Sequence, residues 1–225
     1  MNAIKRKVLL AIEGNIGAGK SFILSAIKSK LKGKPNYLFI DEPVEQFSCA
    51  LLNGSVYNPL GAFYNDPVRH AFSSQVWIYE CYKRQLEALS KQSTHDTTII
   101  MDRGVYSTIM FVEVLRNQGF LTDFEADYMR DKTKELLNLY FGDESFGCDK
   151  LYYLDTPIPL CVERIASRDR CEEKRLKDMG NYLEMLDASY RAYIHDFAQT
   201  SGRDNAVVFH SEDLSETIDR IMCLL

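Results

Sequence analysis

The sequence lacks a long hydrophobic segment, a cysteine pairing pattern and an excess of basic residues. No apolar run reaches 18 residues, so we expect no membrane-spanning helix. The six cysteines include no C-x-x-C pair and no regular Cys/His spacing, which favours reduced thiols over a zinc site or a disulfide framework. The net charge of −5 argues against a nucleic acid as the main partner. Residues 1–7 run directly into an apolar stretch, so we expect no cleavable targeting peptide and a cytoplasmic protein.

The sequence does contain a regular alternation of two kinds of segment. Five short, continuous apolar runs predict buried parallel strands at residues 8–12, 37–40, 98–101, 151–154 and 206–209. Helical patterns occupy residues 22–31, 67–89, 106–118, 122–139, 159–167, 181–199 and 215–224, the fourth opened by a capping box of Thr122 and Glu125. This order predicts one α/β domain over residues 1–225, with a doubly wound five-stranded parallel sheet flanked by helices. Residues 46–66 are irregular, and we expect a loop with a short helix there.

The most specific motif is the octapeptide at residues 14–21, which reads G-N-I-G-A-G-K-S. It lies between the first predicted strand and the first predicted helix, the setting that a phosphate-binding loop requires, and it places the fold in the P-loop NTPase type. Its glycines let backbone N–H groups point at phosphate oxygens, and the helix start adds its positive dipole end. We predict that these eight residues bind the phosphates of ATP: Gly14, Asn15, Ile16, Gly17, Ala18, Gly19, Lys20 and Ser21.

Carboxylates follow three of the predicted strands, at the sheet edge where ligands of such folds bind. Asp102 is the best candidate to organise Mg²⁺ together with the Ser21 hydroxyl, partly through water, and a helix N-cap is the alternative. Glu42 could accept a proton from an incoming hydroxyl, although spacing alone favours an exposed loop acid. Asp155 precedes Thr156-Pro157, and we interpret it as a structural residue at a helix start.

A second cluster consists of arginines at the end of the fifth helical segment. Arg164 and Arg168 are four residues apart, and Arg170 follows in a polar stretch. These side chains could close over a triphosphate as a lid spanning about residues 164–180. The alternative is an exposed, charged helix end with i,i+4 ion pairs. With a phosphate loop in the same chain, we favour the lid.

In this order, the segments resemble the deoxynucleoside kinase family. The resemblance is carried by I-E-G-N-I-G-A-G-K-S at 12–21, D-E-P-V-E at 41–45, D-R-G-V-Y at 102–106, the arginine cluster through Glu173, and Tyr64-x-x-Pro67 through Gln75, covering about residues 8–200. It implies a kinase that transfers phosphate from ATP, with Mg²⁺, to the 5′-hydroxyl of a deoxynucleoside. It also implies a role in nucleotide salvage and DNA precursor synthesis, and a homodimer that contacts neither nucleic acid nor membrane.

The resemblance also implies a role for individual residues. Glu42 matches the general base, which overrides the loop interpretation, and Arg103 matches the arginine beside the 5′-hydroxyl. On the acceptor side, Gln75 matches the reader of the base edge, Phe111 the stacking aromatic, Tyr64 and Glu173 the pair on the 3′-hydroxyl, and Trp77 a pocket-lining residue. On the donor side, Arg168 and Arg170 match the lid arginines and Arg164 an arginine at the base of the lid, while Asp102 matches the carboxylate that organises Mg²⁺.

Three departures from the family pattern concern the acceptor pocket. Gly104 replaces a serine, which we expect to loosen the start of the following helix, and the segment from Arg103 to Phe111 is one residue shorter than in many relatives. Tyr82 stands where members that prefer cytidine or purines often carry an arginine. This difference favours thymidine, or pyrimidine deoxynucleosides in general, as the acceptor.

Two other functions fit parts of the pattern. A nucleotide kinase of the thymidylate kinase type needs basic residues for the acceptor phosphate, but only Arg69 lies close to the predicted acceptor residues, and Glu42 would repel that phosphate. A non-catalytic P-loop switch or regulatory protein would not need Glu42 or the arginine cluster. A GTPase of that class would also carry an N-K-x-D guanine reader, which this sequence lacks.

Overall fold

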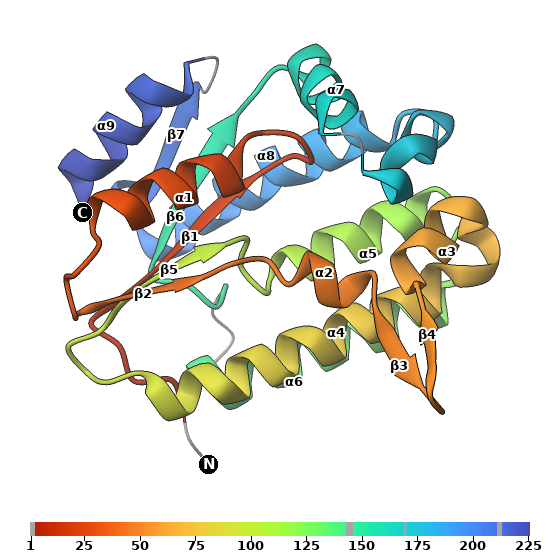
Figure 1. The fold of residues 1–225 in the computed structure, drawn as a ribbon, viewed down its shortest axis with the longest axis horizontal. Coiled ribbons are helices and arrows are strands. Elements are labelled where there is room, and N and C mark those ends of the chain that lie inside the picture. The colour runs from red at the N-terminus through yellow and green to blue at the C-terminus, as the bar shows by residue number, and fades with distance from the viewer. Residues whose placement is uncertain (1–2, 143–145, 169, 211–212) are drawn as a thin grey trace.

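A computed structural model describes residues 3–142, 146–168, 170–210 and 213–225 (Figure 1). Its main sheet contains the five predicted strands, β1 (Val8–Gly14), β2 (Tyr37–Ile40), β5 (Thr98–Asp102), β6 (Lys150–Asp155) and β7 (Ala206–His210). All neighbours are parallel, in the order β2-β5-β1-β6-β7. The predicted doubly wound sheet is therefore confirmed.

The register brings the predicted functional residues to one edge of the sheet. β1 is the central strand, and Ile12 pairs with Asp102 of β5 while Gly14 pairs with Leu154 of β6. From β1 the chain first builds one side of the sheet, with β2 and β5, and then the other, with β6 and β7. The phosphate loop after β1 thus begins where the direction of winding changes, the usual ligand site of such sheets.

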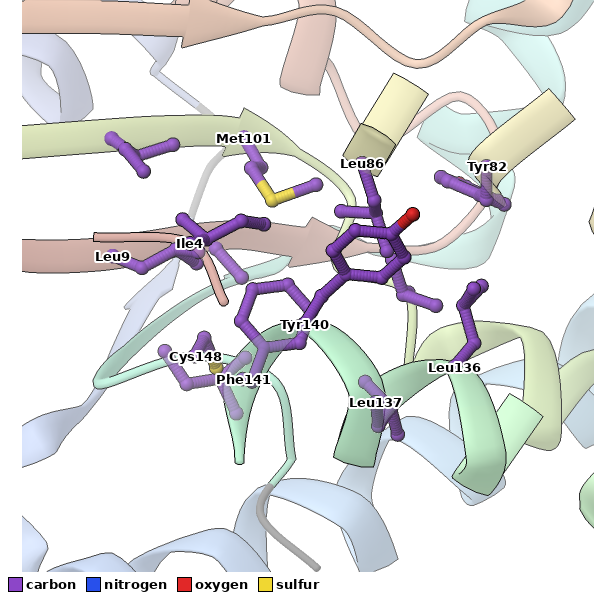
Figure 2. Close-up of a cluster of buried hydrophobic side chains, with 14 of the residues drawn as sticks. Ile4, Leu9, Tyr82, Leu86, Met101, Leu136, Leu137, Tyr140, Phe141 and Cys148 are labelled. Atoms are coloured by element: carbon purple, nitrogen blue, oxygen red, sulfur yellow. The ribbon is translucent and has the colours of Figure 1, made fainter. Parts of the chain in front are cut away.

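Alternating side chains of the strands pack against two layers of helices. On one face, Leu9 and Met101 contact α4 (Pro67–Gln92), α6 (Asp123–Phe141) and α8 (Tyr182–Ser201), in the cluster shown in Figure 2. On the other face, Leu10 and Ile12 contact α1 (Lys20–Lys30), α7 (Ile158–Ser167) and α9 (Leu214–Leu224). Because both faces are covered, the strands read as continuous apolar runs.

A third apolar cluster lies away from the sheet and supports the acceptor side of the site. It joins α3 (Pro59–Asn65), α4, α5 (Ser107–Asn117), α6, α8 and the 3₁₀ helix η1 (Cys171–Asp178). The 26-residue helix α4 takes part in this cluster near its start and in the first cluster near its end. A single rigid helix therefore links the sheet to the segment that contains Tyr64 and Gln75.

The predicted loop at residues 46–66 is more ordered than expected. It contains the end of α2 (Val44–Phe47), a hairpin of β3 (Ala50–Leu52) and β4 (Ser55–Tyr57), and α3, which Asn58 caps through a 2.7 Å bond from the N–H of Gly61. Asn53 and Gly54 turn the hairpin with φ values of 50° and 78°. An Asn-Gly pair is a typical two-residue hairpin turn, but strands of three residues give no clear periodicity.

Several helix ends follow their sequence signals. The predicted capping box of Thr122 and Glu125 opens α6, and Gly119, with a φ of 74°, follows the end of α5.

The remaining element is a short 3₁₀ helix, η2 (Arg203–Asn205). The five cysteines described by the structure, Cys49, Cys81, Cys148, Cys161 and Cys223, are free thiols. Within the described ranges, no helix has both the length and the apolar character needed to span a bilayer.

Candidate active site

The phosphate loop follows β1 and ends in the first turn of α1. Gly17 and Gly19 have φ values of 81° and 101°, in the left-handed region that glycine adopts at no steric cost. A Cβ atom at Gly17 would lie 2.4 Å from the carbonyl oxygen of Cys161, so a side chain cannot be accommodated there. The absence of a side chain at Gly17 thus lets the loop pack against α7 in the curved conformation that a phosphate cradle requires.

Asn15 fastens the loop to helix α8. Its Oδ1 accepts the N–H of Ile16 at 2.8 Å, and its Nδ2 donates to the carbonyl oxygen of Leu183 at 2.8 Å. The side chain is almost completely buried and uses both ends of its amide. The shape of the loop therefore depends on a contact between residues 168 positions apart.

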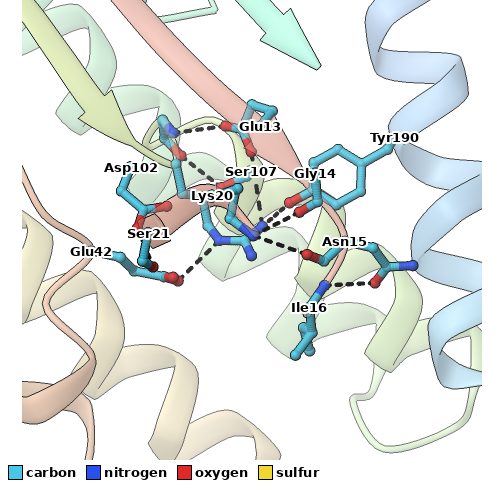
Figure 3. A network of polar contacts seen from close by, with 12 residues as sticks. Glu13, Gly14, Asn15, Ile16, Lys20, Ser21, Glu42, Asp102, Ser107 and Tyr190 are labelled. Atoms are coloured by element: carbon cyan, nitrogen blue, oxygen red, sulfur yellow. Dashed lines mark hydrogen bonds and ion pairs between the residues drawn. The ribbon is translucent and has the colours of Figure 1, made fainter. Parts of the chain in front are cut away.

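Lys20 is buried beneath the loop. Its Nζ donates to the carbonyl oxygens of Gly14 at 3.0 Å and of Asn15 at 2.9 Å (Figure 3). Burial, with a smaller contribution from Arg103, lowers the pKa of Lys20 to about 8. An ammonium group in such surroundings is stabilised by any anion that binds the loop, because the anion supplies the missing countercharge.

Ser21 and Asp102 meet at the edge of the sheet. The Ser21 Oγ donates to Asp102 Oδ2 at 2.6 Å, while Asp102 Oδ1 is buried with no hydrogen-bond partner among the described residues. Burial raises the pKa of this carboxyl. The N-cap alternative for Asp102 is wrong, because Tyr106 is the N-cap of α5.

These two side chains fit a magnesium ion. A hydroxyl and a carboxylate with one spare oxygen are hard oxygen ligands, and Mg²⁺ commonly keeps several waters and binds few protein oxygens. The described part of the chain contains no cluster of three or more His, Cys, Asp or Glu side chains suited to a metal. The site therefore fits an ion whose remaining ligands are water and phosphate.

Arg103 directly follows β5 and faces Glu42, which follows β2. The Arg103 Nε donates to Glu42 Oε1 at 2.9 Å, and its Nη1 bonds to the hydroxyl of Tyr190. Its guanidinium lies over the Phe111 ring, 4.9 Å from the centroid. The side chain of Arg103 is 5% exposed and that of Glu42 is 19% exposed, so only the carboxylate has appreciable access to solvent. The contacts hold the guanidinium in one orientation.

One cavity of about 480 Å³ connects the phosphate loop to α4. Of the predicted phosphate-binding residues, its walls contain Ile16, Gly17, Gly19, Lys20, Ser21, Arg164, Arg168 and Arg170. Of the predicted acceptor residues, they contain Glu42, Tyr64, Gln75, Tyr82, Arg103, Phe111 and Glu173. Gly14, Asn15 and Ala18 do not line it, in keeping with the supporting contacts of Asn15. Donor and acceptor residues from distant segments therefore share one space.

Gln75 and Tyr82 form the α4 wall of this cavity. They are seven residues apart, two helical turns, and so lie on the same face of the helix. Both are more than nine-tenths buried, and within the described chain neither Gln75 Oε1 nor the Tyr82 hydroxyl has a hydrogen-bond partner. Unpaired buried polar atoms are costly, and both belong to side chains that line the cavity, so we expect a ligand bound there to pair with them.

Trp77 does not belong to this wall. Two positions beyond Gln75, its side chain is rotated by about 200° around the helix. Its indole N–H donates to the carbonyl oxygen of Gln46 at 2.7 Å, and the Arg84 guanidinium lies 4.8 Å from its ring centroid. The expectation that Trp77 lines the pocket is corrected, because helical rotation turns it towards α2.

The predicted lid residues contact one another. Glu173 accepts two hydrogen bonds from Arg168, from Nε at 2.7 Å and from Nη2 at 2.6 Å, and lies 3.6 Å from Arg170 Nη1. Arg164 instead donates to the carbonyl oxygen of Ala18 in the phosphate loop at 2.9 Å. Burial, followed by the nearby Glu173, raises the pKa of Tyr64, so its phenol is neutral. Asp169, within the predicted lid, lies outside the described residues.

The sequence interpretation missed three residues around Arg103. Tyr182 lines the cavity, Tyr190 bonds to Arg103, and Glu13 is a fully buried carboxylate at the end of β1. Both tyrosines lie on α8, where a buried aromatic residue resembles any core residue. Glu13 had a usable signal, since a charged residue in the inward-facing series of a buried strand needs a partner.

Asp155 is structural in a different way from the one expected. It accepts a 2.7 Å hydrogen bond from Arg191 and lies 3.3 Å from His210 Nδ1. Pro157, not Asp155, is the N-cap of α7, and no side chain caps that helix. The Thr156 hydroxyl instead donates to the carbonyl oxygen of Ala18 at 3.1 Å. This acid is held in an ion pair beside the site.

Comparison with known proteins identifies the family. A family model described as deoxynucleoside kinase matches residues 10–222. The chain belongs to the deoxynucleoside kinase family. The predicted family is thereby confirmed, and with it phosphorylation of deoxynucleosides as the class of reaction.

The relatives of this deoxynucleoside kinase differ in the substrates that they are named for. The chain is 29% identical over 189 residues to a probable deoxycytidine kinase of fowlpox virus, covering 83% of this chain and 72% of the relative. It is 25% identical over 219 residues to a thymidine kinase of Ictalurid herpesvirus 1, covering 97% and 86%. A solved deoxyadenosine kinase from M. mycoides superimposes with a TM-score of 0.72 at 23% identity, covering 95% and 96%, which shows the shared fold.

Proposed function

We propose that this deoxynucleoside kinase transfers the γ-phosphoryl group of ATP to the 5′-hydroxyl of a deoxynucleoside. The observation that carries the proposal is the shared cavity. It joins a phosphate loop, the Glu42–Arg103 pair and the unpaired amide oxygen of Gln75. A phosphoryl donor, a proton acceptor and a reader of the base are the parts that this reaction needs in one place.

On the donor side, the loop N–H groups and Lys20 hold the triphosphate. The Lys20 ammonium must then exchange its bonds to Gly14 and Asn15 for phosphate oxygens, which the binding of an anion favours. Ser21 and Asp102 would hold Mg²⁺, which when bound supplies positive charge next to the β- and γ-phosphate oxygens. Arg168 and Arg170, and Arg164 at the base of the lid, would neutralise further negative charge on the triphosphate.

On the acceptor side, the sugar and the base are held separately. The neutral phenol of Tyr64 and the Glu173 carboxylate are a donor and an acceptor for the 3′-hydroxyl. The Gln75 amide both donates and accepts, as recognition of a base edge requires, and Phe111 offers a ring face for stacking. Tyr82 contributes a second unpaired polar atom, its hydroxyl oxygen, to the same wall.

The proton transfer is assigned to Glu42. Arg103 occupies Oε1, and we assign Oε2 to the 5′-hydroxyl proton. As the 5′-oxygen bonds to the γ-phosphorus, Glu42 takes that proton and the bond to the β–γ bridging oxygen breaks, releasing ADP. The Arg103 guanidinium keeps Glu42 oriented and faces the negative charge that develops on the transferring group.

The rival nucleotide kinase of the thymidylate kinase type is not favoured by the cavity. Arg69, the basic residue nearest to the predicted acceptor segment in sequence, does not line its wall. Glu42, which does, would repel an acceptor phosphate.

The deciding experiment offers thymidine and thymidine monophosphate separately, each with ATP and Mg²⁺, and measures products by chromatography. We expect the monophosphate to form from thymidine. Phosphorylation of thymidine monophosphate alone would refute the proposal, and nucleotide binding without turnover of any of the four deoxynucleosides would favour the non-catalytic alternative.

Acceptor preference and assembly complete the proposal. Tyr82 in place of an arginine supports acceptance of thymidine or of pyrimidines in general, which kcat/KM values for the four deoxynucleosides would test. We further propose a cytoplasmic homodimer that serves nucleotide salvage, as the family resemblance implies. Light scattering of the purified protein would give its oligomeric state.

A further inference from the structure

Glu13 is a buried carboxylate with no place in the mechanism above. In the alternation of β1, Leu9 and Ala11 face the α4–α6–α8 layer, and Glu13 continues this series. It is 0% exposed and does not line the cavity. Because taking a carboxylate out of water is costly, we expect the contacts of Glu13 in the folded protein to have a specific role.

The contacts of Glu13 are all directed at the turn after β5. Its Oε1 accepts the N–H of Gly104 at 2.7 Å, and its Oε2 lies 3.8 Å from Arg103 Nη1 (Figure 3). Among the described residues, Oε2 has no hydrogen-bond partner. One carboxylate thus contacts both the backbone after Arg103 and the guanidinium of Arg103.

The backbone at Arg103 needs such support. Its φ of 69° is in the left-handed region, which costs a residue other than glycine about 1 kcal/mol or more. Flanking hydrogen bonds hold it there: the N–H of Arg103 donates to the carbonyl oxygen of Ile12 at 3.0 Å, and the next N–H donates to Glu13. Gly104, where the sequence predicts a looser helix start, is thus bonded to Glu13.

The charge of Glu13 serves a further purpose. Arg103 is buried and has Glu42 as its hydrogen-bonded counterion, and Glu42 is also the proposed proton acceptor. Once Glu42 has taken a proton, Arg103 would be left without a hydrogen-bonded anion in a buried site. Glu13, 3.8 Å away, provides the second negative charge that keeps the guanidinium in place. Burial raises the pKa of Glu13 to about 7, and Arg103 opposes this shift.

We propose that Glu13 is a positioning residue for phosphoryl transfer. Its carboxylate holds the turn at Arg103 and Gly104 and shares the Arg103 charge, so that the guanidinium keeps its place beside Glu42 throughout the reaction. Glu13 acts through Arg103 and touches neither substrate. The inference rests on the proposed function, because it assigns Glu13 to the same reaction.

The main test is the Glu13→Gln variant, which keeps the size of the side chain and an oxygen for Gly104 but removes the charge. We expect kcat to fall about 10- to 100-fold, the scale of a small misplacement of a reacting group, with the Kd of the deoxynucleoside changed less than twofold. An unchanged kcat, or a Kd that rises as much as kcat falls, would overturn the proposal. An active wild type with a fully active variant would refute only this inference, whereas an inactive wild type would refute the proposed function.

Two further variants separate positioning from a purely structural role. Asp155→Asn removes a carboxylate from the end of the adjacent strand β6, where it pairs with Arg191, and we expect its kcat to stay within twofold of the wild type. If Glu13→Gln does not fold, Glu13→Asp decides, because it keeps the charge but is too short to hold Gly104 at 2.7 Å. We expect a lower kcat from Glu13→Asp, and a normal kcat would overturn the proposal.

Discussion

Arg168 holds Glu173 by two parallel hydrogen bonds, of 2.7 and 2.6 Å, inside the lid. The sequence predicts these residues for different ligands, Arg168 for phosphate and Glu173 for the sugar 3′-hydroxyl. Because a bidentate pair fixes both partners, the orientation of the proposed sugar-binding carboxylate depends on a proposed phosphate-binding arginine.

We expect Arg168→Ala to weaken deoxynucleoside binding by about three- to tenfold even without a phosphate donor, since it leaves Glu173 without its fixed orientation. A double-mutant cycle of Arg168→Ala and Glu173→Gln, measured by calorimetry, should give effects that do not add. Arg175→Ala, at an exposed position of η1, is the control and should not change the affinity. Additive effects would mean that the hydrogen bonds between Arg168 and Glu173 do not affect how the sugar is bound.

Gln75 is expected to recognise the base. Gln75→Ala removes the amide, with its unpaired oxygen, from the cavity wall, and KM for the deoxynucleoside should rise about tenfold or more with KM for ATP unchanged. Gln85→Ala is a matched control on the same helix. Gln85 also has a buried, unpaired Oε1 among the described residues, but it lies outside the cavity and donates to the carbonyl oxygen of Asp41. Equal effects from both variants would contradict a role in recognition.

Glu42→Gln should separate chemistry from binding. The amide can still occupy the place beside Arg103 but is a poor proton acceptor, so kcat should fall by about 10²–10⁴ while the Kd of the deoxynucleoside stays nearly constant. Rapid-quench measurement of a single turnover would isolate this step. Glu45→Gln, three residues further on and exposed, should behave like the wild type. Near-normal turnover of Glu42→Gln would reject the assignment of the proton acceptor.

Asn15 should contribute to stability as well as to donor binding. Asn15→Ala leaves the buried carbonyl oxygen of Leu183 without its donor, which should lower the free energy of unfolding by about 1–3 kcal/mol in urea titrations. KM for ATP should rise too, because the loop loses its attachment to α8. Ser29→Ala, which removes an exposed hydrogen bond within α1, should change stability by less than about 0.5 kcal/mol. A fully stable Asn15→Ala variant would show that this contact is dispensable.

Stability should depend on pH through Glu13. Its pKa is about 7 in the folded protein and 4.5 in the reference state, so between these values the folded state binds more protons than the unfolded state. The contribution of Glu13 to the free energy of unfolding is therefore fully present below pH 4.5 and is lost as the pH rises through 7. The groups that act on it are Arg103, Lys20 and Glu42.

We expect the wild type to lose stability relative to Glu13→Gln as the pH is raised from 5 to 7, as measured by urea unfolding at each pH. The comparison with this variant removes the contributions of all other titrating groups that the two proteins share. A wild-type stability that stays constant or rises relative to that of the variant over this range would contradict the raised pKa of Glu13.

Local signals were sufficient for the strands of the main sheet and for the loop between β1 and α1. Continuous apolar runs located all five strands of the main sheet, the Thr122–Glu125 capping box located the start of α6, and the octapeptide located the phosphate loop. Each of these signals depends on residues close together in the chain. The hairpin at Asn53-Gly54 was not predicted, because its strands are too short to show a periodic pattern of apolar residues.

The acceptor side was harder to derive, because its residues lie on helices whose rotation decides what they face. Gln75 and Tyr82 share the cavity wall, while Trp77, from the same helix, packs towards Gln46. Family resemblance selected Trp77 by its residue type and position. Only the packing of α4 against α2 and the sheet fixes which side of the helix is available to a ligand.

The sequence by itself determined the order of strands and helices, the phosphate loop and the carboxylates at the strand ends, because these follow from periodicity and from local backbone chemistry. Tertiary structure decided which of these groups meet. It placed Glu42 against Arg103 across 61 residues, Asn15 against Leu183 across 168, and Glu13 beneath the turn at Gly104. Such contacts depend on strand register and helix packing, which no short stretch of sequence encodes.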